Sequence, residues 1–114
     1  MKVSFNGFNE TNATFETATA LDKGALVKMS SNGKVAACTE DDKFIGVVIH
    51  SEDDVATVQL NGYIRVAYSG TAPSVGYAKL LADTTGKKVS VDADGREYLV
   101  IDVDTTNSFV GIIL

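Results

Sequence analysis

The chain has 114 residues and a mass of 12.0 kDa, which suits one hydrophobic core, and its composition (45% hydrophobic, 22% charged, one proline) is that of a globular protein. The formal net charge of −5 disfavours nucleic acid and anionic membranes as partners, and no apolar run approaches the ~18 residues that a membrane-spanning helix needs. Cys38 is the only cysteine and the first residues carry no apolar export segment, so we expect the chain to fold in a reducing cytoplasm.

Residues 1–19 are predicted to form an N-terminal arm or an edge strand. The segment is polar and rich in threonine over residues 9–20, and apart from Val3 its sizeable apolar anchors are Phe5, Phe8 and Phe15. One interpretation is an arm that is loosely docked in the free protein and places these three phenylalanines on a partner surface. The other is that the segment is simply the first strand of the main domain, and the sequence leaves both open.

Residues 20–114 are predicted to form a single β domain, a small barrel or sandwich. Runs of strand-forming residues alternate with turns at 25–29, 34–38, 44–50, 55–60, 63–68, 88–92, 97–103 and 108–114. Asn61-Gly62 predicts a two-residue hairpin turn between its flanking runs, although neither face of that hairpin is cleanly apolar and its register stays open. Residues 77–83 can instead form a single short helical turn.

Two stretches of the domain resemble each other closely. Phe44-Ile45-Gly46-Val47-Val48-Ile49 and Phe109-Val110-Gly111-Ile112-Ile113-Leu114 match in chemical type at each position, and residues 24–35 align with residues 76–89. We therefore predict two degenerate copies of one β unit at about 20–68 and 72–114. Gly46 and Gly111 each interrupt an apolar strand, which indicates a β-bulge or the close approach of another backbone.

The same two stretches bear on assembly. Both of their alternating faces are apolar, whereas a small barrel in water should alternate apolar and polar residues. Either loops of the chain or neighbouring subunits must cover the surplus face. The second possibility predicts an oligomer.

Few residues suggest chemistry, and we expect no catalytic residues, no cofactor and no metal. His50 is the only histidine and is expected to be structural or exposed, while Cys38 follows an apolar run and is expected to be a small buried hydrophobe. The acidic runs 40–42 and 52–54 are interpreted as solvated loops, with a weak cation site as the alternative. Asp92-Ala93-Asp94-Gly95 is interpreted as a hairpin turn, because the further ligands of a calcium loop are missing.

The order of the glycine and aliphatic motifs resembles the small capsid decoration (head-stabilising) proteins of tailed bacteriophages and prophages. The motifs concerned run from Gly24-Ala25-Leu26-Val27-Lys28 through Asn32-Gly33-Lys34-Val35 and Phe44-Ile45-Gly46-Val47 to residues 58–66, and the resemblance extends over residues 20–114. It implies a compact β-barrel-like fold, self-association as a homotrimer, and attachment to the major capsid protein on the virion surface. It offers no catalytic residues to transfer, and it does not extend to residues 1–19.

A second class of function stays open, that of a β-rich binding module for carbohydrate or for a tail or fibre partner. Such a module should display a cluster of exposed aromatic side chains. Its candidates are Tyr63, Tyr68, Tyr77 and Tyr98. An enzyme would need a pocket with converging ionisable groups.

Overall fold

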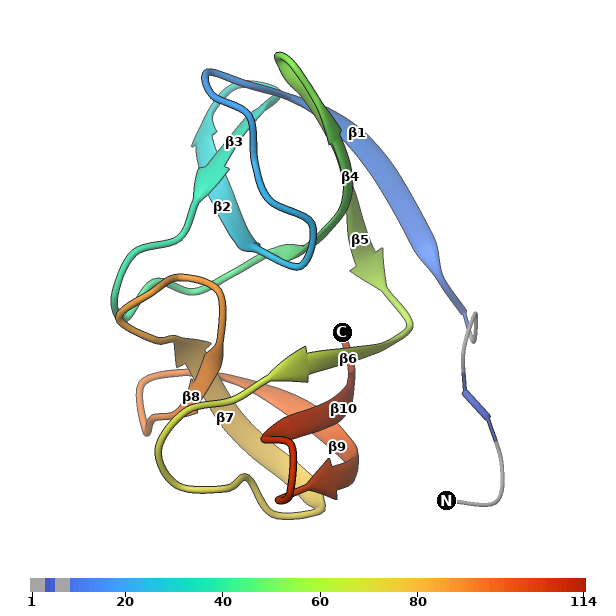
Figure 1. Ribbon diagram of the computed structural model, residues 1–114, viewed down its shortest axis with the longest axis vertical. Coiled ribbons are helices and arrows are strands. Elements are labelled where there is room, and N and C mark those ends of the chain that lie inside the picture. The colour runs from blue at the N-terminus through green and yellow to red at the C-terminus, as the bar shows by residue number, and fades with distance from the viewer. Residues whose placement is uncertain (1–3, 6–8) are drawn as a thin grey trace.

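The computed structural model describes residues 4–5 and 9–114, and the fold is all-β (Figure 1). No helix occurs in these ranges, and the strands are β1 (Thr11–Thr17), β2 (Leu26–Ser31), β3 (Lys34–Ala37), β4 (Gly46–Glu52), β5 (Val55–Asn61), β6 (Tyr63–Ala67), β7 (Gly76–Ala82), β8 (Val89–Val91), β9 (Arg96–Asp104) and β10 (Phe109–Ile113). The prediction of a small all-β barrel is confirmed. All eight predicted strands are present.

The strands form two units that follow one another along the chain. Strands β1 to β5 close into a barrel in the order β1-β3-β2-β4-β5, and β6 to β10 form a sheet in the order β6-β10-β9-β7-β8. In Figure 1 the barrel occupies the upper half of the molecule and the second sheet the lower half. We call them the first unit and the second unit.

The two units have the same topology. If β1 to β5 are matched in order with β6 to β10, each antiparallel pair of the first unit has an antiparallel counterpart in the second. The parallel β1–β3 pair that closes the barrel corresponds to a single parallel bridge between Tyr68 and Val89. The duplication therefore divides the chain near Gly62.

This division corrects the predicted repeat boundaries of 20–68 and 72–114. The alignment of residues 24–35 with 76–89 does fall on equivalent hairpins, β2–β3 and β7–β8. The two Phe-x-Gly stretches do not, because they lead into β4 and β10, and the topological counterpart of β4 is β9. Their likeness reflects similar burial of two different strands.

Most of the buried apolar side chains form two clusters. One fills the first unit with small and β-branched residues such as Val27, Val48 and Val58. The other fills the second unit, and Leu26 and Val47 of the first unit also belong to it. Adjacent residues of β2 and β4 thus point into different cores.

This packing removes the argument for an oligomer that was based on surplus apolar faces. The face of β4 that does not line its own barrel is covered by the second unit of the same chain, and Val47 is fully buried there. In β10, Val110 and Ile112 are fully buried as well, although Phe109 keeps 38% of its surface exposed. A 114-residue chain with two small units can bury both faces of a strand without a neighbour.

The predicted hairpin at Asn61-Gly62 is wrong. Both edges of β5 are already occupied by β4 and β1, so β6 has no edge to join and pairs with β10 instead. Gly62, at φ 91°, turns the chain from one unit into the next. The buried Gln59 amide fixes this crossing by donating to the Asn61 and Tyr63 carbonyl oxygens at 3.1 and 2.9 Å.

The helical turn expected at 77–83 is also wrong, because most of that segment is β7, which pairs with β8 and β9. Over residues 11–17, the segment predicted as an arm or an edge strand is β1. It pairs with β3 on one side and β5 on the other, so it is an interior strand of a closed barrel. Val3 and Phe8 lie outside the described residues.

Gly46 and Gly111 lie where other atoms come close. A Cβ at position 46 would overlap the Gln59 carbonyl oxygen of the neighbouring strand, as expected for the approach of another backbone. At position 111 it would meet the Tyr63 hydroxyl and the Asp102 carboxylate, which are hydrogen-bonded at 3.0 Å across the glycine. A register shift of the β9–β10 pair also follows Gly111, as the bulge interpretation expects.

Asp42 organises the loop that joins β3 to β4. Its carboxylate accepts hydrogen bonds from Lys28 Nζ at 2.7 Å and from the backbone N–H and hydroxyl of Thr39, both at 2.8 Å. This loop also exchanges backbone hydrogen bonds with β7, since Asp41 N–H donates to the Ala82 carbonyl and Ala82 N–H donates to that of Asp42. The loop therefore ties the two units together.

The Asp42 contacts predict a pH-dependent stability. The hydrogen bond from Lys28, followed by those from Thr39, lowers the pKa of Asp42 from 3.8 to about 2. Because this pKa is depressed in the folded state, its contribution is fully present above pH 3.8 and is lost as the pH falls toward 2. Asp42→Asn should therefore lower the melting temperature at about pH 7 and leave it nearly unchanged near pH 2.

Thermal melts across this range test the prediction, with Asp41→Asn as the control. Asp41 is exposed at φ 64°, a conformation that asparagine tolerates, and its side chain makes none of these bonds. Equal melting temperatures for Asp42→Asn and the wild type at about pH 7 would contradict the role given to Asp42.

Candidate functional site

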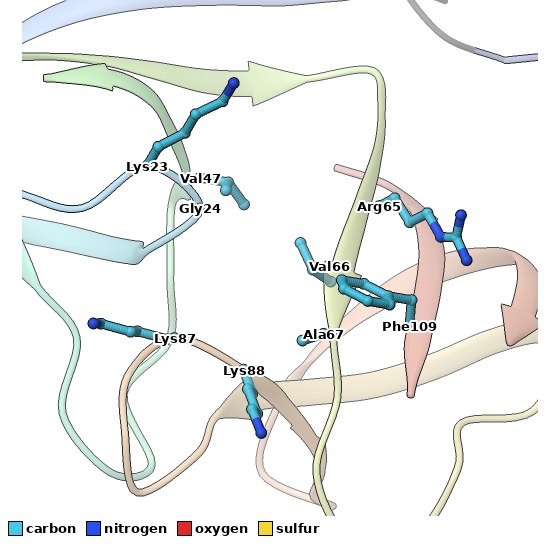
Figure 2. A pocket seen from close by; sticks show the side chains of 9 residues that line it. All are labelled: Lys23, Gly24, Val47, Arg65, Val66, Ala67, Lys87, Lys88 and Phe109. Atoms are coloured by element: carbon cyan, nitrogen blue, oxygen red, sulfur yellow. The ribbon is translucent and has the colours of Figure 1, made fainter. Parts of the chain in front are cut away.

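A groove lies where the two units meet (Figure 2). It encloses about 260 Å³ and draws its walls from five separate segments of the chain. The residues that line it are Lys23, Gly24, Val47, Arg65, Val66, Ala67, Lys87, Lys88 and Phe109. We call this the inter-unit groove.

The floor of the inter-unit groove is apolar and its rim is cationic. Figure 2 shows Val47, Val66 and the Phe109 ring near the middle, while the nitrogen ends of the lysine and arginine side chains lie at the periphery and point in different directions. The cationic heads therefore do not converge on one point. This arrangement suits an extended anionic surface with an apolar side chain better than a single small anion.

Two of the four cations already have carboxylate partners. Lys87 Nζ lies 2.7 Å from Asp22, which lowers the pKa of that carboxyl, and Arg65 lies 2.8 Å from Asp104. The Arg65 guanidinium also lies 5.2 Å from the centre of the Phe109 ring, as in a cation–π contact. Within the described ranges, Lys23 and Lys88 have no carboxylate at ion-pair distance, so the groove keeps an unpaired positive charge on an acidic protein.

A second hollow of about 320 Å³ adjoins the groove. Arg65, Asn107 and Phe109 line it, so the Phe109 ring and the Arg65 side chain belong to both depressions. Asn107 is tied to the Asp104 carboxylate, which holds this rim in place and lowers the pKa of Asp104. The exposed Phe109 ring is therefore shared by the two depressions, next to a rim that Asp104 orders.

The phenylalanines predicted to bind a partner do not form one surface in the described part of the chain. Phe15 is half-buried and packs on the core of the first unit, so it is a structural residue of β1. Phe5 lies against the ring of Tyr63, with 5.9 Å between ring centres. The prediction for Phe8 falls outside the described residues.

The four tyrosines do not provide an exposed aromatic cluster. Tyr63, Tyr68 and Tyr98 are buried, and Tyr98 is stacked on Phe44 with ring centres 5.1 Å apart. Tyr77 is the exposed member, at 72%. A carbohydrate platform built from these side chains would have one ring, whereas stacking sites gain their strength from several.

The remaining candidates for chemistry lie apart from the groove. His50 is exposed and contacts Glu52 at 3.3 Å, as expected for a surface histidine, and Cys38 is buried, where burial first and Asp42 second raise the pKa of its thiol to about 12. In residues 4–5 and 9–114, no three side chains of histidine, cysteine, aspartate or glutamate gather in a way that could hold a metal ion.

No family model and no curated protein matches the chain. The described residues include no helix long and apolar enough to cross a membrane. The groove could not be found from the sequence, because its four cations come from three segments that are far apart in the chain until the two units meet.

Proposed function

We propose that this chain is a structural protein of a tailed phage that decorates the outside of the assembled capsid. It would fold in the bacterial cytoplasm, associate with itself as a homotrimer and bind the major capsid protein on expanded heads. Such a protein stabilises the shell by mass action, because it binds the assembled form and not the free subunit. A symmetric oligomer adds several equal contacts at one symmetry axis.

The observation that carries a protein-binding role is the inter-unit groove. An apolar floor with a rim of four cations, on a chain of net charge −5, suits an acidic protein surface. The resemblance over residues 20–114 supplies the class of partner. Support for self-association now comes from this groove, because both faces of β4 are covered within the chain, whereas Phe109 of β10 stays exposed and lines the groove.

Binding to heads is the direct test. Expanded heads and the isolated major capsid protein of the phage or prophage that carries this chain would each be sedimented with it at about 0.15 M salt. We expect the chain to sediment with heads and to bind the isolated subunit at least about tenfold more weakly, because the site is composed from several neighbouring subunits. Equal binding to the subunit, or no binding to heads, would overturn the proposal.

A further inference from the structure

The inter-unit groove needs an occupant that combines negative charge with an apolar side chain. Lys23 and Lys88 are the unpaired cations on its rim, and Val47, Val66 and Phe109 form its floor. The acidic remainder of the surface would repel such an occupant, because the chain has a net charge of −5, so the complementary pattern also selects the register of binding. The chain itself carries a segment with this pattern.

That segment is the turn between β4 and β5, residues 52–55. Glu52, Asp53 and Asp54 are all exposed, and Val55 follows them with 38% of its surface in contact with solvent. The three carboxylates have no lysine or arginine at ion-pair distance within the described residues; Glu52 lies near His50 only. We call it the acidic turn.

The acidic turn is held in shape before it meets any partner. Asp53 has φ 47°, the Thr17 N–H donates to the Asp54 carbonyl at 2.8 Å, and the Ser51 hydroxyl donates to the Val55 carbonyl at 3.4 Å. A turn that is already ordered loses little conformational entropy on binding. This favours it as a docking element.

Several of the other acidic side chains are already engaged. Asp42 is bound to Lys28 and Thr39, Asp22 to Lys87, and Asp104 to Arg65 and Asn107. Asp92 accepts a hydrogen bond from the Asp94 N–H within its own turn. Of the two acidic runs, 52–54 keeps three carboxylates without a lysine or arginine partner in the described residues, whereas 40–42 keeps two, because Asp42 is bound to Lys28.

The turn cannot reach the groove of its own molecule. Figure 1 places the β4–β5 connection at the far end of the first unit, opposite the second unit, whereas the groove lies at the junction of the two. A contact between them must join two copies of the chain. Because the two surfaces differ, the contact is head-to-tail, the kind that closes into a ring when the rotation between copies allows it.

We propose that the chain associates with itself by seating the acidic turn of one copy in the inter-unit groove of the next. The carboxylates of residues 52–54 face Lys23 and Lys88, and Val55 rests on the apolar floor. This inference rests on the self-association in the proposed function, and it names the two surfaces that make the contact.

The test is a charge exchange between the two surfaces, followed by light scattering over protein concentrations from about 1 to about 500 micromolar. The groove variant is Lys23→Glu with Lys88→Glu, and the turn variant is Glu52→Lys with Asp54→Lys. The fourfold variant combines them and has the formal net charge of the wild type, because two lysines and two acids exchange places. Lys43→Glu with Lys79→Glu is the control, since both lysines are exposed, lie outside the groove and form no ion pair within the described residues.

We expect wild-type protein to exceed the 12.0 kDa of one chain at about 0.05 M NaCl and to dissociate toward it at about 0.5 M NaCl. Each two-residue variant should raise the association midpoint at least about tenfold, and the fourfold variant should restore it to within about threefold. The control should stay within about twofold of wild type. Circular dichroism and a thermal melt confirm that each variant is folded.

Association that is unchanged in both two-residue variants, or a folded fourfold variant that does not recover it, would overturn the contact. So would wild-type protein that remains a single chain throughout. The sedimentation test with heads is read separately. If the chain binds heads but the charge-exchange variants do not change self-association as expected, the contact is rejected and the capsid role is kept. If the variants behave as expected but the chain does not bind heads, the contact is kept and the capsid role is rejected.

Discussion

Gly46→Val is expected to lower the free energy of unfolding by at least ~3 kcal/mol, or to prevent cooperative folding altogether. The added Cβ would overlap the Gln59 carbonyl oxygen and meet Val58 Cγ1 at 2.8 Å. The overlap can be relieved only if β4 and β5 move apart. That movement is costly because the pairing of β4 with β5 helps to close the first unit, and because Val47 and Val48 on β4 belong one to each core. Urea denaturation followed by circular dichroism measures the effect.

Gly111→Val provides an informative comparison in the same assay. The atoms that its Cβ would meet belong to the ends of the Tyr63 and Asp102 side chains, which can rotate away at the cost of their hydrogen bond. We expect it to cost less than Gly46→Val, about 1–3 kcal/mol. Ala93→Val on an exposed turn is the control and should stay within about 0.5 kcal/mol of the wild type. A Gly46→Val protein as stable as that control would show that the strands can separate freely.

Local sequence patterns predicted most strands, because runs of β-branched residues between glycine and asparagine turns rarely adopt any other secondary structure. They failed at β7, where Tyr77-Ala78-Lys79-Leu80-Leu81-Ala82 is composed largely of good helix formers. Pairing with β8 and β9 buries Leu80, Leu81 and Ala82 and overrides that preference. Propensity is a weak guide where long-range pairing supplies the burial.

The hairpin at Asn61-Gly62 failed for a related reason. The dipeptide permits a tight turn, but a hairpin also needs a free edge on the first strand, and β5 has none once β1 closes the barrel. That closure depends on a polar, threonine-rich segment whose sequence gave little sign of an interior strand. The inter-unit groove depends in turn on the crossing at Gly62, which is why its lining residues had no recognisable spacing.

Deleting residues 2–19 is expected to abolish cooperative unfolding. The deletion removes β1, which pairs with β5 over residues 11–16 and with β3 at its end, and it removes Phe15, which packs on the first core. Loss of a half-buried phenylalanine side chain alone costs ~1–2 kcal/mol. The unpaired backbone of β3 and β5 adds to that, against a total stability of only ~5–15 kcal/mol. Because Leu26 and Val47 of the first unit also complete the second core, we expect both units to be lost together.

Deleting residues 2–10 is the matched control, since it keeps all ten strands. It removes Phe5, whose ring contact with Tyr63 is worth about 1 kcal/mol, so a cooperative melt close to that of the wild type is expected. Circular dichroism melts of the two truncated chains distinguish a structural strand from a docking arm. If the chain without residues 2–19 unfolded cooperatively at the wild-type temperature, β1 would be dispensable for the fold and its threonine-rich face would be free for a partner.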